Sequence, residues 1–162
     1  MYFLRTFFLG EIAAEFLPPK KQTSRNVVIF CDGAPGVPSK RTLMKFFHAK
    51  GYWVIHLRYR GTWESGGEFL KISPHQDVLD VIDVLPRGFV DLWDKVTYRV
   101  QPKKIIRIGG SSGGPAVILA SRDSRVTKVI AVAPVVDWSQ LGPWETMDRF
   151  EDFMTTAFTH VY

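Results

Sequence analysis

The apolar positions of the chain fall into short runs that predict strands. Residues 2–17 form two extended runs on either side of Gly10, and this pattern predicts an antiparallel hairpin. Later runs also predict strands, and two of them, 26–31 and 126–136, are apolar enough to be buried on both faces of a parallel sheet. The remaining predicted strands are 52–59 and 101–108.

Between the predicted strands 26–31 and 52–59, apolar residues recur at the spacing of a helix. Ser39 is expected to cap the start of this helix, and Gly51 to end it. Leu43, Phe46 and Phe47 fall on one helical face. We expect that face to pack against the sheet.

The second half of the chain predicts further helices. Ser73, Pro74 and Gln76 have the spacing of a capping box at a helix start. Residues 89–96 predict a second helical piece, and 115–123 a short helix before the last strand.

Strands that alternate with helices indicate βαβ units, whose crossovers are right-handed in nearly all proteins. We therefore predict an α/β fold with a doubly wound, mostly parallel sheet and an N-terminal hairpin. A chain of 162 residues fits a single domain, residues 1–162. Within it, residues 140–162 are expected to begin a cap or lid segment.

Composition narrows the class of partner. The formal net charge is +5, but the basic residues are scattered rather than gathered in a stripe, so no nucleic-acid partner is predicted. Cys31 is the only cysteine, which excludes an internal disulfide or a multi-cysteine zinc site and fits a cytoplasmic location. Arg5, Glu11 and Glu15 interrupt the apolar N-terminus, so no membrane span is predicted there. Nothing calls for a metal ion or an organic cofactor.

The run GGSSGG at 109–114 lies between a predicted strand and a predicted helix, where α/β sheets usually carry their sites. Phosphate binding is one interpretation, although a dinucleotide motif would need glycine at 111 and no Lys-Ser/Thr follows. In another, the glycines only let the helix pack on the strand. The third is a nucleophile elbow, G-x-S-x-G, which places a serine on a tight strand-to-helix turn.

The elbow motif occurs in two overlapping frames, centred on Ser111 and Ser112. With Ile108 as the last strand residue, a nucleophile at 111 leaves two glycines for the turn and puts Pro115 in the first helical turn, where its missing N–H costs little. We therefore predict Ser111 as the nucleophile. The backbone N–H of Ser112 then becomes one donor of an oxyanion hole.

With this elbow the chain resembles α/β-hydrolases, and within them the prolyl-oligopeptidase-like and dienelactone-hydrolase-like serine hydrolases. The resemblance implies an oxyanion loop in which the N–H of Ala34 is the second donor, and in which Asp32 stands where histidine is common. It also implies an acid and then a base after the serine. The similar segments are VIFCDGAPGVPSK (28–40), YRGTWESGGEF (59–69), GGSSGGPAVILAS (109–121) and VIAVAPVVDW (129–138).

Neither partner of the serine is identified by sequence. Asp137 follows a strand and is a weak candidate for the acid, and His160 is the only histidine after Ser111. His48, His56 and His75 are expected to be packing or surface histidines. We therefore expect low turnover and a chain that is a fragment, a shortened gene product or one half of an assembly.

Two functional hypotheses follow. The first is a serine esterase or peptidase that acts on a small-molecule ester or peptide, with Trp63 and Glu64 near its pocket. The second is a non-catalytic binding module that pairs through its last strand, as a homo-oligomer or with a C-terminal partner. In the second hypothesis the partner also meets the aromatic residues Trp138, Trp144, Phe150, Phe153 and Phe158.

Overall fold

A computed structural model of the chain describes residues 2–21, 23–33, 39–137 and 139. The candidates Ala34 and His160, the aromatic residues from Trp138 to Phe158, and the expected lid at 140–162 lie outside these residues. The helices are α1 (Arg41–Ala49), α2 (Pro74–Val84), α3 (Gly113–Leu119) and the short 3-10 helix η1 (Ala120–Arg122). The strands are β1 (Leu4–Phe8), β2 (Ile12–Leu17), β3 (Asn26–Cys31), β4 (Trp53–Leu57), β5 (Phe89–Val90), β6 (Thr97–Tyr98), β7 (Lys104–Gly110) and β8 (Lys128–Val132).

The main sheet has six strands in the order β1-β2-β4-β3-β7-β8. β1 and β2 form the expected antiparallel hairpin, which continues antiparallel onto β4. The pairs β3–β4, β3–β7 and β7–β8 are parallel. The α/β prediction with a mostly parallel sheet is therefore confirmed.

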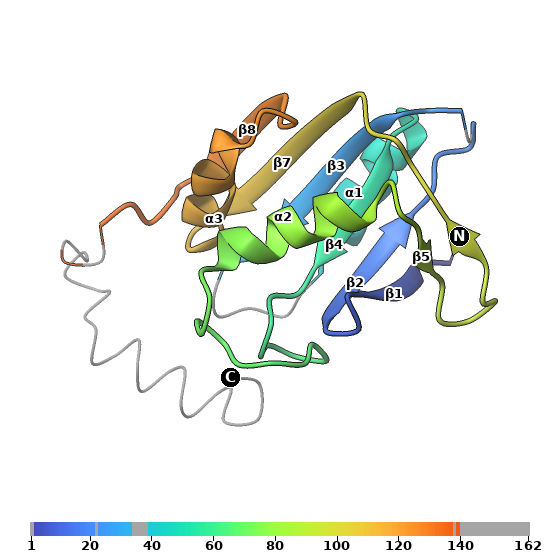
Figure 1. The fold of residues 1–162 in the computed structure, drawn as a ribbon. Helices are drawn as coiled ribbons and strands as arrows, with labels where there is room; N and C mark the ends of the chain where they lie inside the picture. Colours follow the sequence, from blue (N-terminus) through green and yellow to red (C-terminus); the bar gives the residue numbers. More distant parts are fainter. Residues whose placement is uncertain (1, 22, 34–38, 138, 140–162) are drawn as a thin grey trace.

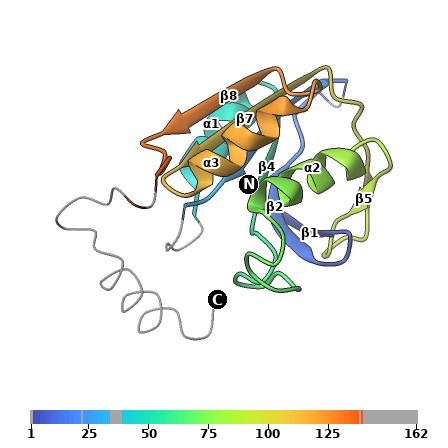
Figure 2. The same ribbon diagram turned by 60° about the vertical axis from the view of Figure 1, so that its left-hand side comes forward.

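Helices cover both faces of this sheet (Figures 1 and 2). On one face, Met44 of α1 packs with Val28, Phe30 and Val54 of the sheet. On the other face, α2 and α3 pack over the alternate positions of the same strands, such as Ile29, Ile55 and Ile105. This alternation explains why β3 and β4 are apolar almost throughout.

β8 differs from the other parallel strands. Its apolar residues are typical of a buried strand, but as the last predicted strand it was also expected at a sheet edge with uncovered side chains. In the structure its residues are half-buried or exposed, and Val132 is 57% exposed. The reason is its place at the edge of the sheet that the described residues form.

α1 starts later in the chain than the sequence pattern predicts, and it packs a different face against the sheet. Its N-cap position is Lys40 rather than Ser39. The residues that it buries are Met44 and His48, whereas Leu43 and Phe46 are exposed. The set 44, 47 and 48 has helical spacing just as 43, 46 and 47 does, so apolarity alone could not choose the face.

α2 begins at Pro74 after Ser73, as predicted, but the capping-box hydrogen bonds do not form. The hydroxyl of Ser73 instead hydrogen-bonds Nδ1 of His75 at 2.7 Å. Nε2 of Gln76 donates to Asp80 at 2.9 Å. The helix start therefore rests on the backbone of Ser73 and on Pro74.

The helix predicted at 89–96 is wrong, because β5 and β6 form a small hairpin there. Asp91 is fully buried, and its Oδ2 accepts hydrogen bonds from the backbone N–H groups of Trp93 and Asp94. Its Oδ1 accepts from the N–H of Arg5 in β1 at 3.2 Å. The two local bonds hold the segment in a turn, and the bond from Arg5 ties that turn to β1; together they override the helical spacing.

Candidate active site

Ser111 lies at the turn from β7 into α3, with a backbone φ of +50°. This left-handed conformation strains a residue with a side chain by about 1–3 kcal/mol. Ser112 has an ordinary helical φ of −63°. The strained turn expected of an elbow therefore falls on Ser111, although β7 runs to Gly110 rather than ending at Ile108 as predicted.

The end of β8 holds this turn in place. The N–H of Ser111 donates to the carbonyl of Val132 at 3.1 Å. Its carbonyl accepts from the N–H groups of Gly114 at 3.0 Å and Val135 at 3.1 Å. Backbone bonds from three other residues therefore fix the serine in its strained conformation.

The glycines around Ser111 are required by close approach of the backbone. A methyl group added at Gly109 would lie 2.3 Å from the carbonyl oxygen of Gly113, and one at Gly113 would lie 2.3 Å from that of Asp32. At Gly110 the nearest atom would be 3.6 Å away, an ordinary contact. The frame Gly109–Ser111–Gly113 is thus the one in which both glycines are sterically needed.

The chain that leaves β3 passes directly against the serine. A methyl group at Gly33 would lie 2.8 Å from Cβ and 3.4 Å from Oγ of Ser111. This is where the sequence places the oxyanion loop. The role of Ala34 as a donor, and that of the N–H of Ser112, remain predictions.

Asp32, just before Gly33, is bound on several sides. Its Oδ2 lies 2.6 Å from Nε2 of His56, and its Oδ1 lies 2.9 Å from Nζ of Lys40. Its carbonyl oxygen accepts from the hydroxyl of Tyr59 at 3.2 Å. Burial alone would raise the pKa of Asp32, but the hydrogen bonds and charges of His56 and Lys40 outweigh it and lower that pKa.

The candidate acid, Asp137, is exposed. Its Oδ1 accepts from the hydroxyl of Ser139 at 2.6 Å and from its N–H at 2.9 Å, and these bonds lower the pKa of Asp137. The carboxylate therefore caps its own turn, and the structure does not link it to Ser111.

The histidines of the described residues lie elsewhere in the fold. His48 is buried on α1, His56 is buried on β4 beside Asp32, and His75 lies in the first turn of α2 beside Ser73. In the part of the chain that the structure describes, none of the hydrogen bonds of these histidines reaches Ser111. No base for the serine can be assigned among them.

The loop after β4 is anchored by Arg60. Its guanidinium pairs with Glu11 at 2.7 Å, with Asp80 at 2.8 Å and with Asp77. Gly61 follows with a φ of +71°, and a methyl group there would lie 2.1 Å from the N of Phe69. The Arg-Gly pair of this loop is thus explained by an ion-pair anchor and a tight turn.

Glu64 of the same loop is bound to arginines rather than left for a substrate. Its carboxylate pairs with Arg58 at 2.9 Å and with Arg5. The adjoining Trp63 has a φ of +53°. The prediction that Trp63 and Glu64 shape a substrate pocket stays a prediction.

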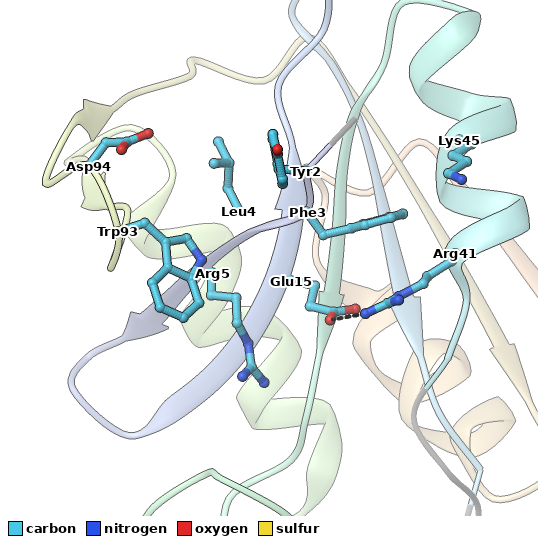
Figure 3. A pocket seen from close by; sticks show the side chains of 9 residues that line it. All are labelled: Tyr2, Phe3, Leu4, Arg5, Glu15, Arg41, Lys45, Trp93 and Asp94. Carbon is cyan, nitrogen blue, oxygen red and sulfur yellow. Dashed lines mark ion pairs between the residues drawn. The ribbon is translucent and has the colours of Figure 1, made fainter.

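A hollow of about 810 Å³ opens on the antiparallel side of the sheet (Figure 3). It is lined by residues 2–5, Glu15, Arg41, Lys45 and the turn at 93–94. None of these residues belongs to the Ser111 turn. Figure 3 shows the Glu15 carboxylate paired with Arg41 among the lining side chains, so its charge is engaged within the protein.

Sequence reasoning missed two buried polar groups. One is buried His56, which with the partly exposed Asp32 and Lys40 forms a cluster whose members are separated along the chain. The other is Arg107, which is fully buried on β7. Its Nε and both terminal nitrogens have no hydrogen-bond partner among the described residues. The signal that the sequence offered for it is an arginine within an otherwise apolar strand segment, Ile105, Ile106 and Ile108.

Metal and membrane features can be judged only within the same described ranges. There, no group of three or more His, Cys, Asp or Glu side chains is placed to hold a metal ion. No helix in those ranges combines the length and apolarity needed to cross a membrane.

Comparisons with known proteins agree on the fold. The chain aligns with the esterase of Pyrococcus furiosus (16% identity, TM-score 0.66), covering 98% of this chain and 62% of that one. The α/β-hydrolase GrgF from Penicillium is 20% identical with a TM-score of 0.61, and the alignment covers 98% of this chain and 52% of GrgF. The acylaminoacyl peptidase of Pyrococcus horikoshii is 17% identical with a TM-score of 0.62, and the alignment covers 85% of this chain and 24% of the peptidase. The chain thus spans less than two thirds of each of these proteins.

Sequence comparison gives the family. No curated protein matches the chain. The model of the prolyl oligopeptidase family, Peptidase_S9, matches residues 38–158, which is most of the chain and includes the Ser111 turn. Together with the six-stranded sheet and its neighbours, this match shows that the chain belongs to the prolyl oligopeptidase family and has the α/β-hydrolase fold.

Proposed function

We propose that the chain carries the nucleophile of a serine hydrolase that cleaves small-molecule esters or peptide bonds through an acyl-enzyme on Ser111. The observation that supports this most is the φ of +50° at Ser111, on a strand-to-helix turn against which Gly33 is packed. Strain held by surrounding bonds is typical of reactive turns. Esterase and peptidase neighbours, and the family itself, agree with the proposed reaction class.

In the proposed reaction, Oγ of Ser111 attacks the carbonyl carbon of the substrate and loses its proton to a base. The N–H groups of Ala34 and Ser112 donate to the oxyanion that forms. Collapse of this intermediate breaks the ester or amide bond, and the leaving alcohol or amine takes the proton. Water then hydrolyses the acyl-enzyme and restores the serine.

The reaction also needs a base for Ser111 and an acid that orients this base. Asp137 and His160 remain the candidates, and Asp137 is engaged with Ser139. Among the described residues no base is hydrogen-bonded to Ser111, and a serine hydroxyl without a base is a weak nucleophile. We therefore expect slow turnover of the 162-residue chain, while the turn and its proposed oxyanion donors still favour reaction with strong acyl or phosphonyl donors.

A fluorophosphonate probe tests the proposal. We expect stoichiometric labelling that peptide mapping places on Ser111 and that Ser111→Ala abolishes. Ser121→Ala, which changes an exposed serine in η1, serves as the matched control and should label like the unaltered chain. Labelling on Ser112, or none at all, would overturn the assignment of Ser111.

A second candidate function is a non-catalytic binding module. The edge position of β8, with Val132 57% exposed, favours it, because an open strand edge can pair with another chain. Size-exclusion chromatography with light scattering tests this candidate. A monomer at all concentrations would count against self-pairing through β8.

A further inference from the structure

We propose that Asp32 is a positioning residue, whose carboxylate, bridged between His56 and Lys40, holds Gly33 against Ser111 and so sets the reactivity of that serine. This inference rests on the proposed function, because it concerns the same serine. It starts from the contact between Gly33 and Ser111, where an added methyl group would come within 2.8 Å of Cβ. Any shift of residue 33 therefore changes the wall beside the hydroxyl.

His56 fixes one side of the carboxylate. It lies near the end of β4, is 0% exposed, and stands beside Phe30 of β3 in the sheet register. Its Nε2 is 2.6 Å from Oδ2 of Asp32, and its Nδ1 has no hydrogen-bond partner in the described part of the chain. A buried ring that makes a single polar contact cannot turn away without losing it, so β4 defines where Asp32 sits.

Lys40 fixes the other side. Its Nζ lies 2.9 Å from Oδ1, and it occupies the N-cap position of α1. The ion pair therefore joins the residue that precedes Gly33 to the start of α1. The side chain of Lys40 is 35% exposed, whereas that of Asp32 is 17% exposed, so this charge pair is shielded on the Asp32 side.

The main chain of Asp32 is held as closely as its side chain. Tyr59 donates to its carbonyl oxygen, and the backbone at Gly113 packs against the same oxygen. Contacts from β4, the loop after it, α1 and α3 thus converge on one residue. Because misplacement by about 1 Å near a reacting group can cost about a hundredfold in rate, this convergence is enough to tune Ser111.

The test measures the second-order rate of fluorophosphonate labelling at Ser111 in full-length variants. Asp32→Asn keeps the size of the side chain and removes its charge, and we expect it to slow labelling at least about tenfold. Lys40→Met should slow it less, and Lys40→Arg, which restores the cation, should recover most of the rate. Lys50→Met, at the opposite end of α1, is the matched control and should label at the unaltered rate.

A structural readout separates this inference from the proposed function. In ¹⁵N-labelled protein, Asp32→Asn and Lys40→Met should shift the amide signals of Gly33 and Ser111, and Lys40→Arg should not. If Ser111 labels in the unaltered chain but equally fast in Asp32→Asn, the positioning role is wrong and the serine assignment stands. If Ser111 never labels, the proposed function fails, and unchanged amide signals in both variants would overturn the positioning role independently.

Equal labelling in Lys40→Met and Lys40→Arg, with both slow, would also overturn the role given to the charge of Lys40. Thermal midpoints of all variants show whether a slow rate reflects unfolding. If Asp32→Asn loses its fold, the labelling rates of Lys40→Arg and Lys40→Met are compared instead, because both of these substitutions change a partly exposed side chain.

Discussion

The two faces of the sheet beneath Ser111 bury charge in opposite ways. On the α1 face, Asp32 has a partner on each carboxylate oxygen, His56 and Lys40. On the face covered by α2 and α3, Arg107 is fully buried with no hydrogen bond from its guanidinium to any described residue. Of these two charged groups, the one with partners on the described residues is therefore the one beside Gly33 and Ser111.

Arg107 also has neighbours that do not compensate its charge. Burial lowers the pKa of Arg107 to about 10, although Cys31 and Asp123 oppose this shift. Burial likewise raises the pKa of the Cys31 thiol to about 12, so at neutral pH the thiol is uncharged and the guanidinium charged. Asp123 is engaged by Arg125 at 2.6 Å. A charge buried without a partner costs stability.

The largest effect on stability is expected at Gly113, where the start of α3 packs against the backbone of Asp32. Gly113→Ala places a methyl group 2.3 Å from the carbonyl oxygen of Asp32, and since backbone atoms cannot move aside cheaply, we expect a loss of about 3 kcal/mol in the free energy of unfolding. Gly110→Ala, with a nearest contact of 3.6 Å, should stay within about 0.5 kcal/mol. Urea unfolding measures both, and equal losses would contradict the close packing at Gly113.

Removing the buried charge of Arg107, which has no hydrogen-bond partner among the described residues, should stabilise the protein. Arg107→Leu replaces a buried guanidinium with an apolar side chain on the face that already holds Ile29 and Ile105, and we expect a gain of about 2 kcal/mol in the free energy of unfolding. The comparison variant is Arg60→Leu, which removes a guanidinium with three carboxylate partners and should destabilise. A loss of stability in Arg107→Leu would mean that its charge is compensated.

The contribution of Asp32 to the free energy of unfolding should depend on pH. The pKa of Asp32 is lowered in the folded state from 3.8, so its contribution is fully present above about pH 4 and is lost as pH falls through the folded pKa. Asp32→Asn should therefore be less stable than the unaltered chain by about 1–2 kcal/mol at pH 6. Unfolding curves between pH 2 and 6 should show this gap closing toward acid; a constant gap would argue against a charged Asp32.

The smallest effect concerns one hydrogen bond to the backbone of Asp32. Tyr59→Phe removes the hydroxyl that donates to the carbonyl of Asp32 at 3.2 Å and leaves the ring in place. We expect a loss of about 1 kcal/mol in the free energy of unfolding. Tyr52→Phe, which alters a half-buried tyrosine beside Phe47, is the control and should change stability less.

The sequence predicted the features that depend on local pattern. β3 is continuous in apolar residues and was placed at its observed bounds, 26–31. The turn at Ser111 was predicted from glycine spacing, because such a turn leaves no room for side chains two residues away. In both cases the determining residues are neighbours in the chain, which is why pattern sufficed.

Features that depend on distant partners were not predictable. The face of α1 was misassigned because Leu43 and Met44 are equally apolar, and only the sheet distinguishes them. The turn at Asp91 needs the N–H of Arg5, far away in sequence. His56 becomes a partner of Asp32 only once β3 and β4 are paired in register. Such pairings follow from topology, which a single sequence does not specify.

The bonds that hold Ser111 also set the order in which its turn can form during synthesis. Its N–H and carbonyl are bound by Val132 and Val135, which leave the ribosome after it. Gly33 and Asp32, by contrast, are made long before and must wait for β7 to pair with β3. The strained turn at Ser111 can therefore close only after β8 has been synthesised, so it becomes ordered later than β3 and β7, whose pairing precedes it.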